Sequence, residues 1–192
     1  MKTFKEFVVN NPIRIIMLGG PGSGKSTYSK YITKHFGIPH LYTGDMMRAL
    51  SKKDTPEGRK VKAALDSGKY VDTKIVMNAV MDRLKNPDTM RGYVFDGFPR
   101  NMEQVRAMEK NEIKADHIVN LNVSEDEVIK RLTARGRADD KPDIIRQRLA
   151  THEKETGPVI KHYEDKLINI KAEDKTPEEI AGDIIKKVES RS

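Results

Sequence analysis

The chain has 192 residues, among them 36 Lys or Arg, 29 Asp or Glu and no cysteine, and its formal net charge is +7. The lack of cysteine excludes a disulfide scaffold, a catalytic thiol and a thiolate metal site. Because no apolar stretch approaches the roughly 18 residues of a membrane span and the N-terminus lacks the apolar core of a signal peptide, we expect a cytoplasmic protein of one domain with no membrane partner.

Short apolar runs alternate with helical patterns along the chain. In chain order, the patterns predict a strand at 13–18, helices at 25–36, 56–65 and 73–84, a strand at 92–95, a helix at 102–109, a strand at 117–123, a helix at 144–164 and a strand at 167–170. Parallel neighbours need crossover connections, which the intervening helices provide. The sequence therefore predicts an α/β fold with a parallel β-sheet flanked by helices.

Two further helix starts have the residues of a capping box, in which a hydroxyl and a carboxylate satisfy backbone donors of the first turn. These pairs are Ser124 with Glu127 and Thr176 with Glu179. We therefore expect one helix to begin after each pair.

Residues 1–12 stand apart from the rest of the chain. A short helical pattern there ends at Pro12, before the first strand, and its apolar face is too small to favour a membrane anchor. We expect an N-terminal extension at 1–12, either a short helix or an arm packed on the body, followed by a single domain at 13–192.

The segment GGPGSGKS at 19–26 fits the pattern G-x-x-x-x-G-K-[ST] and lies between a predicted strand and a predicted helix. Its glycines let successive backbone N–H groups face an anion, and the helix N-terminus adds positive charge. Lysine in this pattern neutralises the β- and γ-phosphates, and the hydroxyl after it is offered to Mg²⁺. We expect the triphosphate contacts to come from Gly22, Ser23, Gly24, Lys25, Ser26 and Thr27.

The net positive charge indicates an anionic partner, but its distribution does not favour nucleic acid. No block of five consecutive basic residues occurs, and aromatic residues are few. Single arginines suit phosphates better, because the planar guanidinium grips two phosphate oxygens. Two of them, Arg131 and Arg135, are four residues apart at a predicted helix end and would repel without an anion between them, although a solvated basic face is the alternative. The candidates are Arg48, Arg100, Arg131, Arg135, Arg137 and Arg148.

Three further segments follow the phosphate loop: YTGDMMRAL at 42–50, VFDGFPR at 94–100 and GRADD at 136–140. In this order and spacing the chain resembles a short-lid adenylate kinase, a nucleoside monophosphate kinase with the P-loop kinase fold. The resemblance implies an AMP-binding helical segment at 42–71, a short lid at 135–142 and the reaction MgATP + AMP ⇌ MgADP + ADP. ATP is then a co-substrate, and Mg²⁺ is the expected cofactor.

The resemblance also assigns roles to the charged residues by position. The expected catalytic set is Lys25, Arg100, Arg131, Arg135, Arg137, Arg148 and Asp139. Asp139, with Asp140, is expected to orient the arginines. Capping of the helix that follows stays open as a further role for Asp139. Arg48 and Arg100 are assigned to the AMP phosphate. Arg131 and Arg135 are assigned to the ATP side, and Arg137 and Arg148 to the transferred group.

Two aspartates are candidates for the magnesium shell. Asp96, which ends a predicted strand, resembles the carboxylate that holds Mg²⁺ through water, together with the hydroxyl of Ser26. A carboxylate at the carboxyl edge of a parallel sheet lies where such folds bind ligands. Asp45 either joins this shell or serves as a helix N-cap.

The base pocket is expected around Gln104, whose amide can both donate to and accept from the edge of adenine. The UMP/CMP kinases carry asparagine at this position. Asn101, by contrast, resembles the residue of the UMP/CMP kinases, so a kinase of that kind stays an alternative. Gln104 could also be an ordinary exposed helix residue with no role in base binding. Tyr70 is bulkier than the usual leucine. The AMP contacts implied are Thr43, Arg48, Lys69, Tyr70, Val71, Gly97, Phe98, Pro99, Arg100, Gln104, Arg137 and Arg148.

The remaining expectations concern ATP, the lid and the partners. The resemblance places the ATP base near a turn at 172–175 that includes Asp174. The six residues at 136–141 are too few for an inserted β-lid, so we expect a loop without zinc. We expect a monomer that binds small nucleotides and no nucleic acid. A P-loop nucleic-acid-binding or regulatory module is the alternative from another class, supported only by the net charge.

Overall fold

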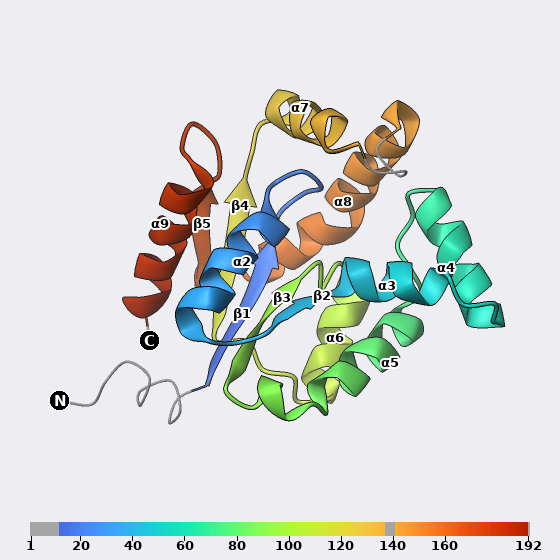
Figure 1. The fold of residues 1–192 in the computed structure, drawn as a ribbon, viewed down its shortest axis with the longest axis horizontal. Helices are drawn as coiled ribbons and strands as arrows, with labels where there is room; N and C mark the ends of the chain where they lie inside the picture. Colours follow the sequence, from blue (N-terminus) through green and yellow to red (C-terminus); the bar gives the residue numbers. More distant parts are fainter. Residues whose placement is uncertain (1–11, 137–140, 192) are drawn as a thin grey trace.

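The computed structural model describes residues 12–136 and 141–191. In this part of the chain five parallel strands form one sheet in the order β2-β3-β1-β4-β5 (Figure 1). The predicted α/β fold is therefore confirmed, and each predicted strand is present. The strands are β1 (Ile13–Leu18), β2 (His40–Tyr42), β3 (Gly92–Asp96), β4 (His117–Asn122) and β5 (Leu167–Lys171).

The helices follow the predicted boundaries to within two residues. The hydrophobic pattern does not predict β2 or the helix after it, because a strand of three residues is too short to show a period of two. The helices are α2 (Lys25–Phe36), α3 (Thr43–Ser51), α4 (Pro56–Asp66), α5 (Thr73–Leu84), α6 (Met102–Lys110), α7 (Glu125–Arg135), α8 (Pro142–His162) and α9 (Pro177–Glu189), with short 3₁₀ turns at η1 (Pro87–Thr89) and η2 (Glu164–Lys166).

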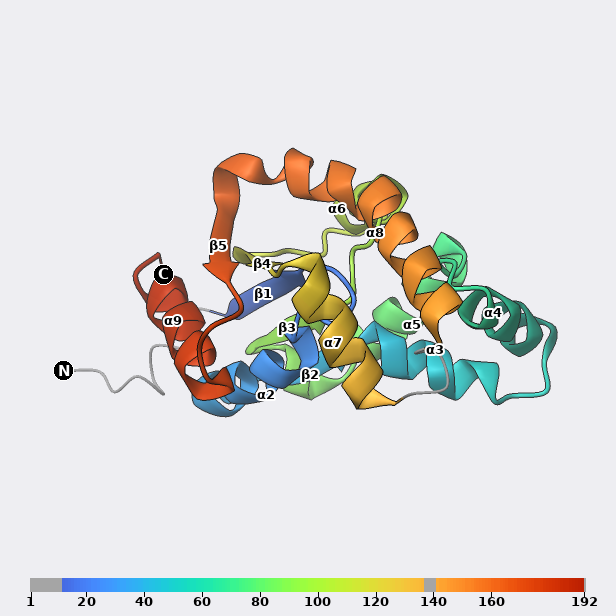
Figure 2. The ribbon, with the colours of Figure 1, turned by 90° about the horizontal axis from the view of Figure 1, so that it is seen from above.

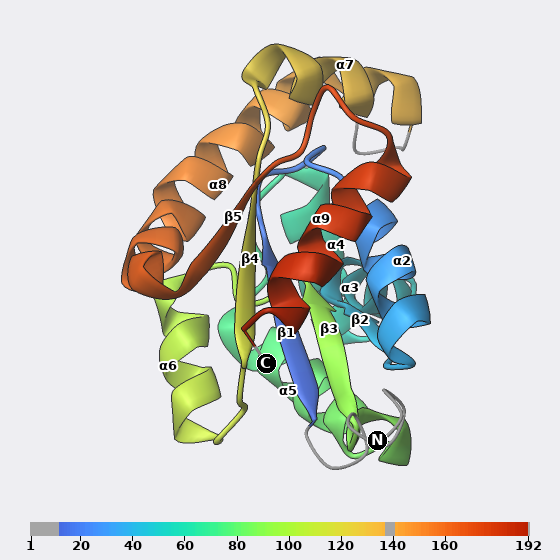
Figure 3. The ribbon, with the colours of Figure 1, turned by 90° about the vertical axis from the view of Figure 1, so that its left-hand side faces the viewer.

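Helices cover both faces of the sheet, which explains why its strands are apolar throughout (Figure 3). Alternate residues of β1 belong to two different core clusters. Ile15 and Met17 pack with residues of α2 and α9, whereas Ile16 and Leu18 pack with residues of α3, α5, α6 and α8. Within the described ranges no helix is long and apolar enough to cross a membrane.

The strand order brings the two main motif loops to the same edge of the sheet. β1 pairs with β3 in parallel, with Met17 opposite Asp96, and it pairs with β4 on its other side. The phosphate loop and the DGFPR loop therefore leave neighbouring strands at their carboxyl ends, where the chain changes direction across the sheet and such folds bind ligands. Figure 2 shows α7 passing across this edge.

The two predicted capping boxes have different outcomes. At α9 the box is confirmed: Glu179 N–H donates to Thr176 Oγ1 at 3.3 Å, and Thr176 N–H donates to Glu179 Oε2 at 2.8 Å. At α7 the prediction is wrong. Ser124 is the N-cap, but its hydroxyl donates to Glu173 at 2.9 Å, and Glu127 instead pairs with Arg131. Tertiary partners have replaced the local ones.

We predict that Thr176→Ala lowers the free energy of unfolding by about 1 kcal/mol, because it removes the acceptor for a backbone N–H in the first turn of α9. Urea denaturation measures this change. Thr133→Ala is the control, since the exposed Thr133 hydroxyl donates only to the carbonyl of Ile129 in its own helix. An equal loss in both variants would contradict a specific contribution from the capping box.

Candidate active site

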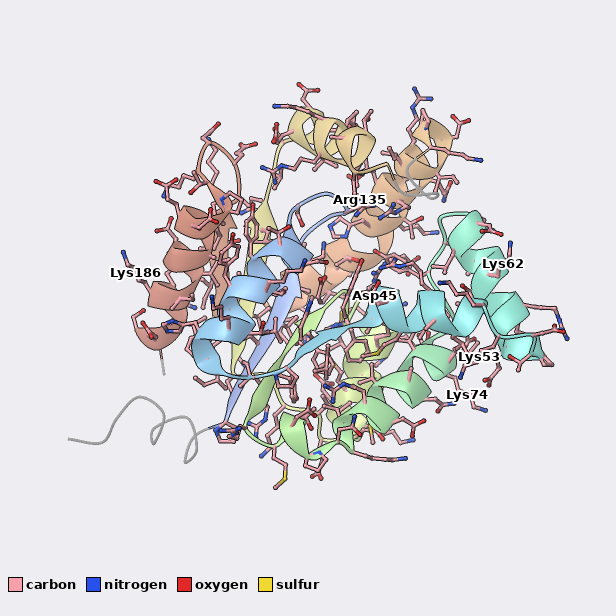
Figure 4. All side chains as sticks on the ribbon, in the orientation of Figure 1. Asp45, Lys53, Lys62, Lys74, Arg135 and Lys186 are labelled. Carbon is pink, nitrogen blue, oxygen red and sulfur yellow. The ribbon has the colours of Figure 1, made fainter. Side chains whose placement is uncertain are left out.

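A cavity of about 390 Å³ lies at the carboxyl edge of the sheet, between the phosphate loop, α3, the β3–α6 loop, α7 and α8. Figure 4 shows Arg135 at the end of α7 and Asp45 on α3, and it shows Lys53, Lys62 and Lys74 on the outer side formed by α4, α5 and the segment after α3. The predicted residues that line the cavity are Gly22, Gly24, Lys25, Ser26, Thr27, Arg48, Lys69, Tyr70, Asp96, Gly97, Pro99, Arg100, Arg131, Arg135 and Arg148.

A second cavity of about 40 Å³ adjoins the first and shares lining residues with it. Thr43, Val71 and Gln104 line this smaller cavity. Ser23, Phe98 and Asp174 line neither cavity: Ser23 is buried within the phosphate loop, Phe98 belongs to the core, and the Asp174 side chain is exposed and paired with Lys171. The predicted residues Arg137, Asp139 and Asp140 lie outside the described residues, as do residues 1–11 of the expected extension.

The phosphate loop holds Lys25 over its own backbone. Gly24 precedes α2 with φ of 92°, a left-handed conformation that favours glycine, and a Cβ there would lie 2.6 Å from the ring of Tyr28. The Lys25 ammonium donates to the carbonyls of Gly19 at 2.6 Å and Gly20 at 2.7 Å. An ammonium at the N-terminus of a helix, above a curled glycine loop, is suited to bind phosphate oxygens.

The cavity lowers the pKa of Lys25 to about 8. Burial is the main cause, and the positive charges of Arg100, Arg148 and Arg135 act in the same direction, while Asp96 opposes them. Burial, helped by the neighbouring arginines, therefore destabilises the charged form of Lys25. An anion placed among them would reverse this effect.

Asp96 is the buried carboxylate of the cavity. Its Oδ2 accepts from the Ser26 hydroxyl at 2.5 Å and contacts His40 Nε2 at 3.2 Å. Burial alone would raise the pKa of this carboxyl, but His40, Lys25 and Ser26 together lower it below its usual value. Asp96 is therefore ionised at neutral pH.

The same carboxylate has the features of a magnesium ligand. Its Oδ1 is buried and, among the described residues, has no hydrogen-bond partner. Such an orphaned oxygen is costly unless a ligand or water completes it. Carboxylate and hydroxyl oxygens are the donors that Mg²⁺ prefers, so the pair Asp96 and Ser26 fits this ion. In the described ranges no group of three or more histidine and acidic side chains could hold a metal ion by itself.

Asp45 is not the N-cap of α3, and its carboxylate pairs with Arg48. The N-cap of α3 is Tyr42, and Asp45 lies inside the first turn, so the N-cap interpretation of Asp45 is wrong. Its carboxylate instead accepts from Arg48 Nη2 at 2.5 Å and Nε at 3.2 Å. The i,i+3 spacing on one helix explains this pair.

Gln104 is almost completely buried, at 1 % exposure, so its interpretation as an ordinary exposed helix residue is wrong. Its Oε1 accepts from the backbone N–H of Arg100 at 2.7 Å, which fixes the amide in the small cavity. Thr43 Oγ1 donates to the carbonyl of Gly97 at 2.8 Å. A Cβ at Gly97, where φ is 77°, would lie 3.0 Å from that hydroxyl oxygen, so the close packing here requires glycine. The peptide bond before Pro99 is cis.

Arg131 and Arg135 lie in the last turns of α7, as predicted, and both line the large cavity. Arg131 Nε donates to Glu127 at 2.8 Å, and its Nη2 donates to the carbonyl of Ala172 at 2.9 Å. The expectation that the two arginines need an anion between them is therefore too strong, because Glu127 already compensates one charge. The Ala172 contact joins α7 to the turn expected near the ATP base.

His152 is a cavity residue that the sequence analysis misses. It lies on α8 four residues after Arg148, and Thr156 follows after four more, so all three share one face of the helix. That spacing from Arg148 is the signal that could have found them. Burial, with the charges of Lys25 and Arg100, lowers the pKa of His152 to about 4, and the imidazole is neutral at pH 7.

The fold and this cationic cavity define the class of P-loop nucleotide-binding proteins. The family model of the adenylate kinases matches residues 17–168. The adenylate kinase of Corynebacterium aurimucosum is 44% identical over 172 residues, which cover 88% of this chain and 94% of the relative. That of Corynebacterium glutamicum is 42% identical, covering 86% and 94%, and adenylate kinase 1 of a Nostoc species is 38% identical, covering 89% and 96%.

The chain belongs to the adenylate kinase family. This confirms the resemblance on which the site assignment depends, and it does not favour a pyrimidine nucleotide kinase or a nucleic-acid-binding module. The individual roles of the site residues remain predictions.

The lowered pKa of Lys25 predicts proton uptake when a nucleoside triphosphate binds. Phosphate oxygens favour the charged ammonium, so binding raises a pKa that otherwise lies at about 8. At pH 8 we expect MgATP to bind with uptake of about half a proton, and its affinity to fall as the pH rises from 7 to 9. Isothermal titration calorimetry in buffers of different ionisation enthalpy measures this uptake.

Lys25→Arg is the matched control, because a guanidinium stays charged throughout this pH range. The variant is expected to bind MgATP at pH 8 with the same heat in every buffer. Equal proton uptake by the wild type and the variant would show that the protons go to another group.

Proposed function

We propose that the chain is an adenylate kinase that transfers a phosphoryl group reversibly between MgATP and AMP. The observation that carries this proposal is that one cavity is lined both by the phosphate loop with Lys25 and by Arg48 and Arg100, which come from α3 and the β3–α6 loop. Arginines of α7 and α8 complete its wall. Membership of the adenylate kinase family supports the same activity.

The reaction requires the two phosphates to be held in line and does not require an activated side chain as nucleophile. The phosphate of AMP is itself an anionic nucleophile, so its oxygen can attack the γ-phosphorus of ATP while the bond to the β-phosphate oxygen breaks. The obstacle is the repulsion between the two anions. Cations that hold both phosphates in line remove this repulsion and supply the effective concentration of a bound pair.

On the triphosphate side, Lys25 and the N–H groups of the phosphate loop would bind the β- and γ-phosphates. Arg131 and Arg135 would neutralise the charge that moves to the leaving group, and the hydrogen bond from Arg131 to Ala172 supports a base site beside the 172–175 turn. Asp174 would contribute there through its backbone, since its side chain is turned to Lys171.

On the monophosphate side, Arg48 and Arg100 would hold the phosphate, and Arg148 would bridge to the transferred group. The base would enter the small cavity beside Thr43, Val71 and Gln104. The expected segment at 42–71 would then form one wall of this pocket, with Lys69 and Tyr70 at its edge. Phe98 would support the pocket from the core.

Ser26 and Asp96 would hold Mg²⁺, the carboxylate through water. When bound, the ion would neutralise phosphate charge and orient the triphosphate. The orphaned Oδ1 of Asp96 supports this assignment. Arg137, oriented by Asp139 in the lid expected at 135–142, would complete the cationic wall, and the lid would exclude water from the reacting phosphates.

The proposal further includes a monomer that acts in the cytoplasm, where both nucleotide substrates are found. Its domain organisation would be the single kinase domain at 13–192 preceded by the extension at 1–12.

A coupled assay over the nucleoside monophosphates tests the function. We expect AMP to be phosphorylated with MgATP, Lys25→Met to lower kcat/KM by about 100-fold or more, and Arg137→Ala to lower kcat far more than it weakens ATP binding. An inhibitor that joins two adenosines through five phosphates should bind at nanomolar concentration. Turnover of CMP or UMP in preference to AMP, or unchanged kcat in Arg137→Ala, would refute the respective assignments.

Gln104→Asn tests the base pocket separately. The shorter amide withdraws its donor from the adenine edge, so we expect kcat/KM for AMP to fall about tenfold, the equivalent of one hydrogen bond, and the ratio of CMP or UMP to AMP turnover to rise. Steady-state kinetics with each monophosphate give these values. An unchanged ratio of CMP or UMP to AMP turnover would show that Gln104 does not recognise the base. KM for MgATP is the internal control and should not change.

A further inference from the structure

Two tyrosines lie against the arginines assigned to the AMP phosphate. The guanidinium carbon of Arg48 is 5.0 Å from the ring centroid of Tyr42, and that of Arg100 is 5.1 Å from the ring centroid of Tyr70. Both distances are within the range of cation–π attraction, which is about 6 Å or less. All four side chains line the large cavity.

Tyr70 also joins three separate parts of the site. Its hydroxyl is 2.9 Å from Thr156 Oγ1 on α8, and that threonine hydroxyl donates to the carbonyl of Arg100 at 2.7 Å. Because a threonine hydroxyl has one hydrogen to donate, Tyr70 is the donor to Thr156. The chain of bonds therefore runs from the 67–72 loop through α8 to the backbone of the DGFPR loop.

The same loop packs on α8 over a wider area. A Cβ placed on Gly68 would lie 3.2 Å from Gln147 and 3.3 Å from Arg148. Tyr70 is half-buried in this contact, and Thr156 is almost fully buried, at 3 % exposure. The hydroxyl pair is therefore partly shielded from water, which strengthens its contribution.

We propose that Tyr42 and Tyr70 are positioning residues for the monophosphate, each holding the guanidinium of one arginine over its ring. This inference rests on the proposed function, because it takes Arg48 and Arg100 as the AMP phosphate ligands. A ring contacts the guanidinium without taking its N–H groups, whereas the Asp45 carboxylate takes two of those of Arg48, which an incoming phosphate must share or displace.

The two arginines differ in how much they depend on their tyrosines. Arg48 has a second partner in Asp45, whose carboxylate takes two of its N–H groups. Arg100 is held otherwise through Nε, which donates to the carbonyl of Gly97 at 2.7 Å. An arginine fixed before its ligand arrives loses less side-chain entropy on binding. Loss of either ring should therefore weaken AMP binding and leave ATP binding unchanged.

Kinetics of Tyr70→Leu and Tyr70→Phe separate the ring from the hydroxyl. We expect Tyr70→Leu to raise KM for AMP about 10-fold, and Tyr70→Phe, which keeps the ring, to raise it about 2- to 3-fold. KM for MgATP should stay within about twofold in both variants. Thr156→Val removes this bond and also the one to the carbonyl of Arg100, so it should raise KM for AMP at least as much as Tyr70→Phe. The double variant should be no worse than Thr156→Val alone, because that variant already lacks the bond that Tyr70→Phe removes.

Tyr42→Leu and Tyr42→Phe provide the second arm. Because the Tyr42 side chain also hydrogen-bonds Arg48, Tyr42→Leu should raise KM for AMP more than Tyr42→Phe, which keeps the ring and loses that bond. Tyr31→Leu is the matched control for the loss of a tyrosine, since the Tyr31 hydroxyl also joins two elements, donating to Glu178 at the start of α9 outside the cavity. Thermal melting of each variant accompanies the kinetics, and Tyr31→Leu should lower the melting temperature without changing KM for AMP.

Arg100→Ala distinguishes the failure of the inference from the failure of the proposed function. If Arg100→Ala raises KM for AMP at least 10-fold while Tyr70→Leu leaves it unchanged, the positioning role is overturned and the phosphate assignment stands. If Tyr70→Leu raises KM for AMP and for MgATP equally, its role is merely structural and the inference is again overturned. If Arg100→Ala leaves KM for AMP unchanged, the phosphate assignment itself is overturned, and the inference with it.

Discussion

The parallel pairing of β1 with β3 decides where the charged groups of the cavity lie. It sets Met17 opposite Asp96, so the phosphate loop and the DGFPR loop start side by side at one edge of the sheet. The bond between Ser26 and Asp96 then joins the two loops directly. Without this register, Lys25 and Arg100 would have no common cavity to line.

The balance of charge in the cavity follows from that placement. One buried carboxylate, Asp96, faces a lysine and several arginines, and burial, together with the positive charges, lowers the pKa of both Lys25 and His152. The protein tolerates this cost because its folding is stabilised elsewhere, by two apolar cores on the faces of the sheet. Phosphate anions would offset the repulsion between these buried positive charges. This links the electrostatics of the site to its proposed substrates.

The sequence was sufficient for the fold and for the parts of the site that depend on local pattern. Strand and helix periods, the glycine pattern around Lys25 and the position of Gln104 four residues after Arg100 all carry through to the structure. Side-chain hydrogen bonds between residues that are distant in the chain could not be predicted. Ser124 bonds Glu173 rather than its own helix, and Tyr70 reaches Thr156 across 86 residues, so neither partner lies near enough in the chain to leave a periodic signal.

Helix α8 has a consequence for how the two ends of the cavity are related. Arg148, His152 and Thr156 are spaced at intervals of four residues, so along a rigid helix they span about 12 Å. Arg148 is proposed to touch the transferred group, and Thr156 fixes the backbone of the monophosphate loop. The helix therefore fixes the distance between Arg148 and the backbone of the DGFPR loop, and substitutions in the small cavity leave that distance unchanged.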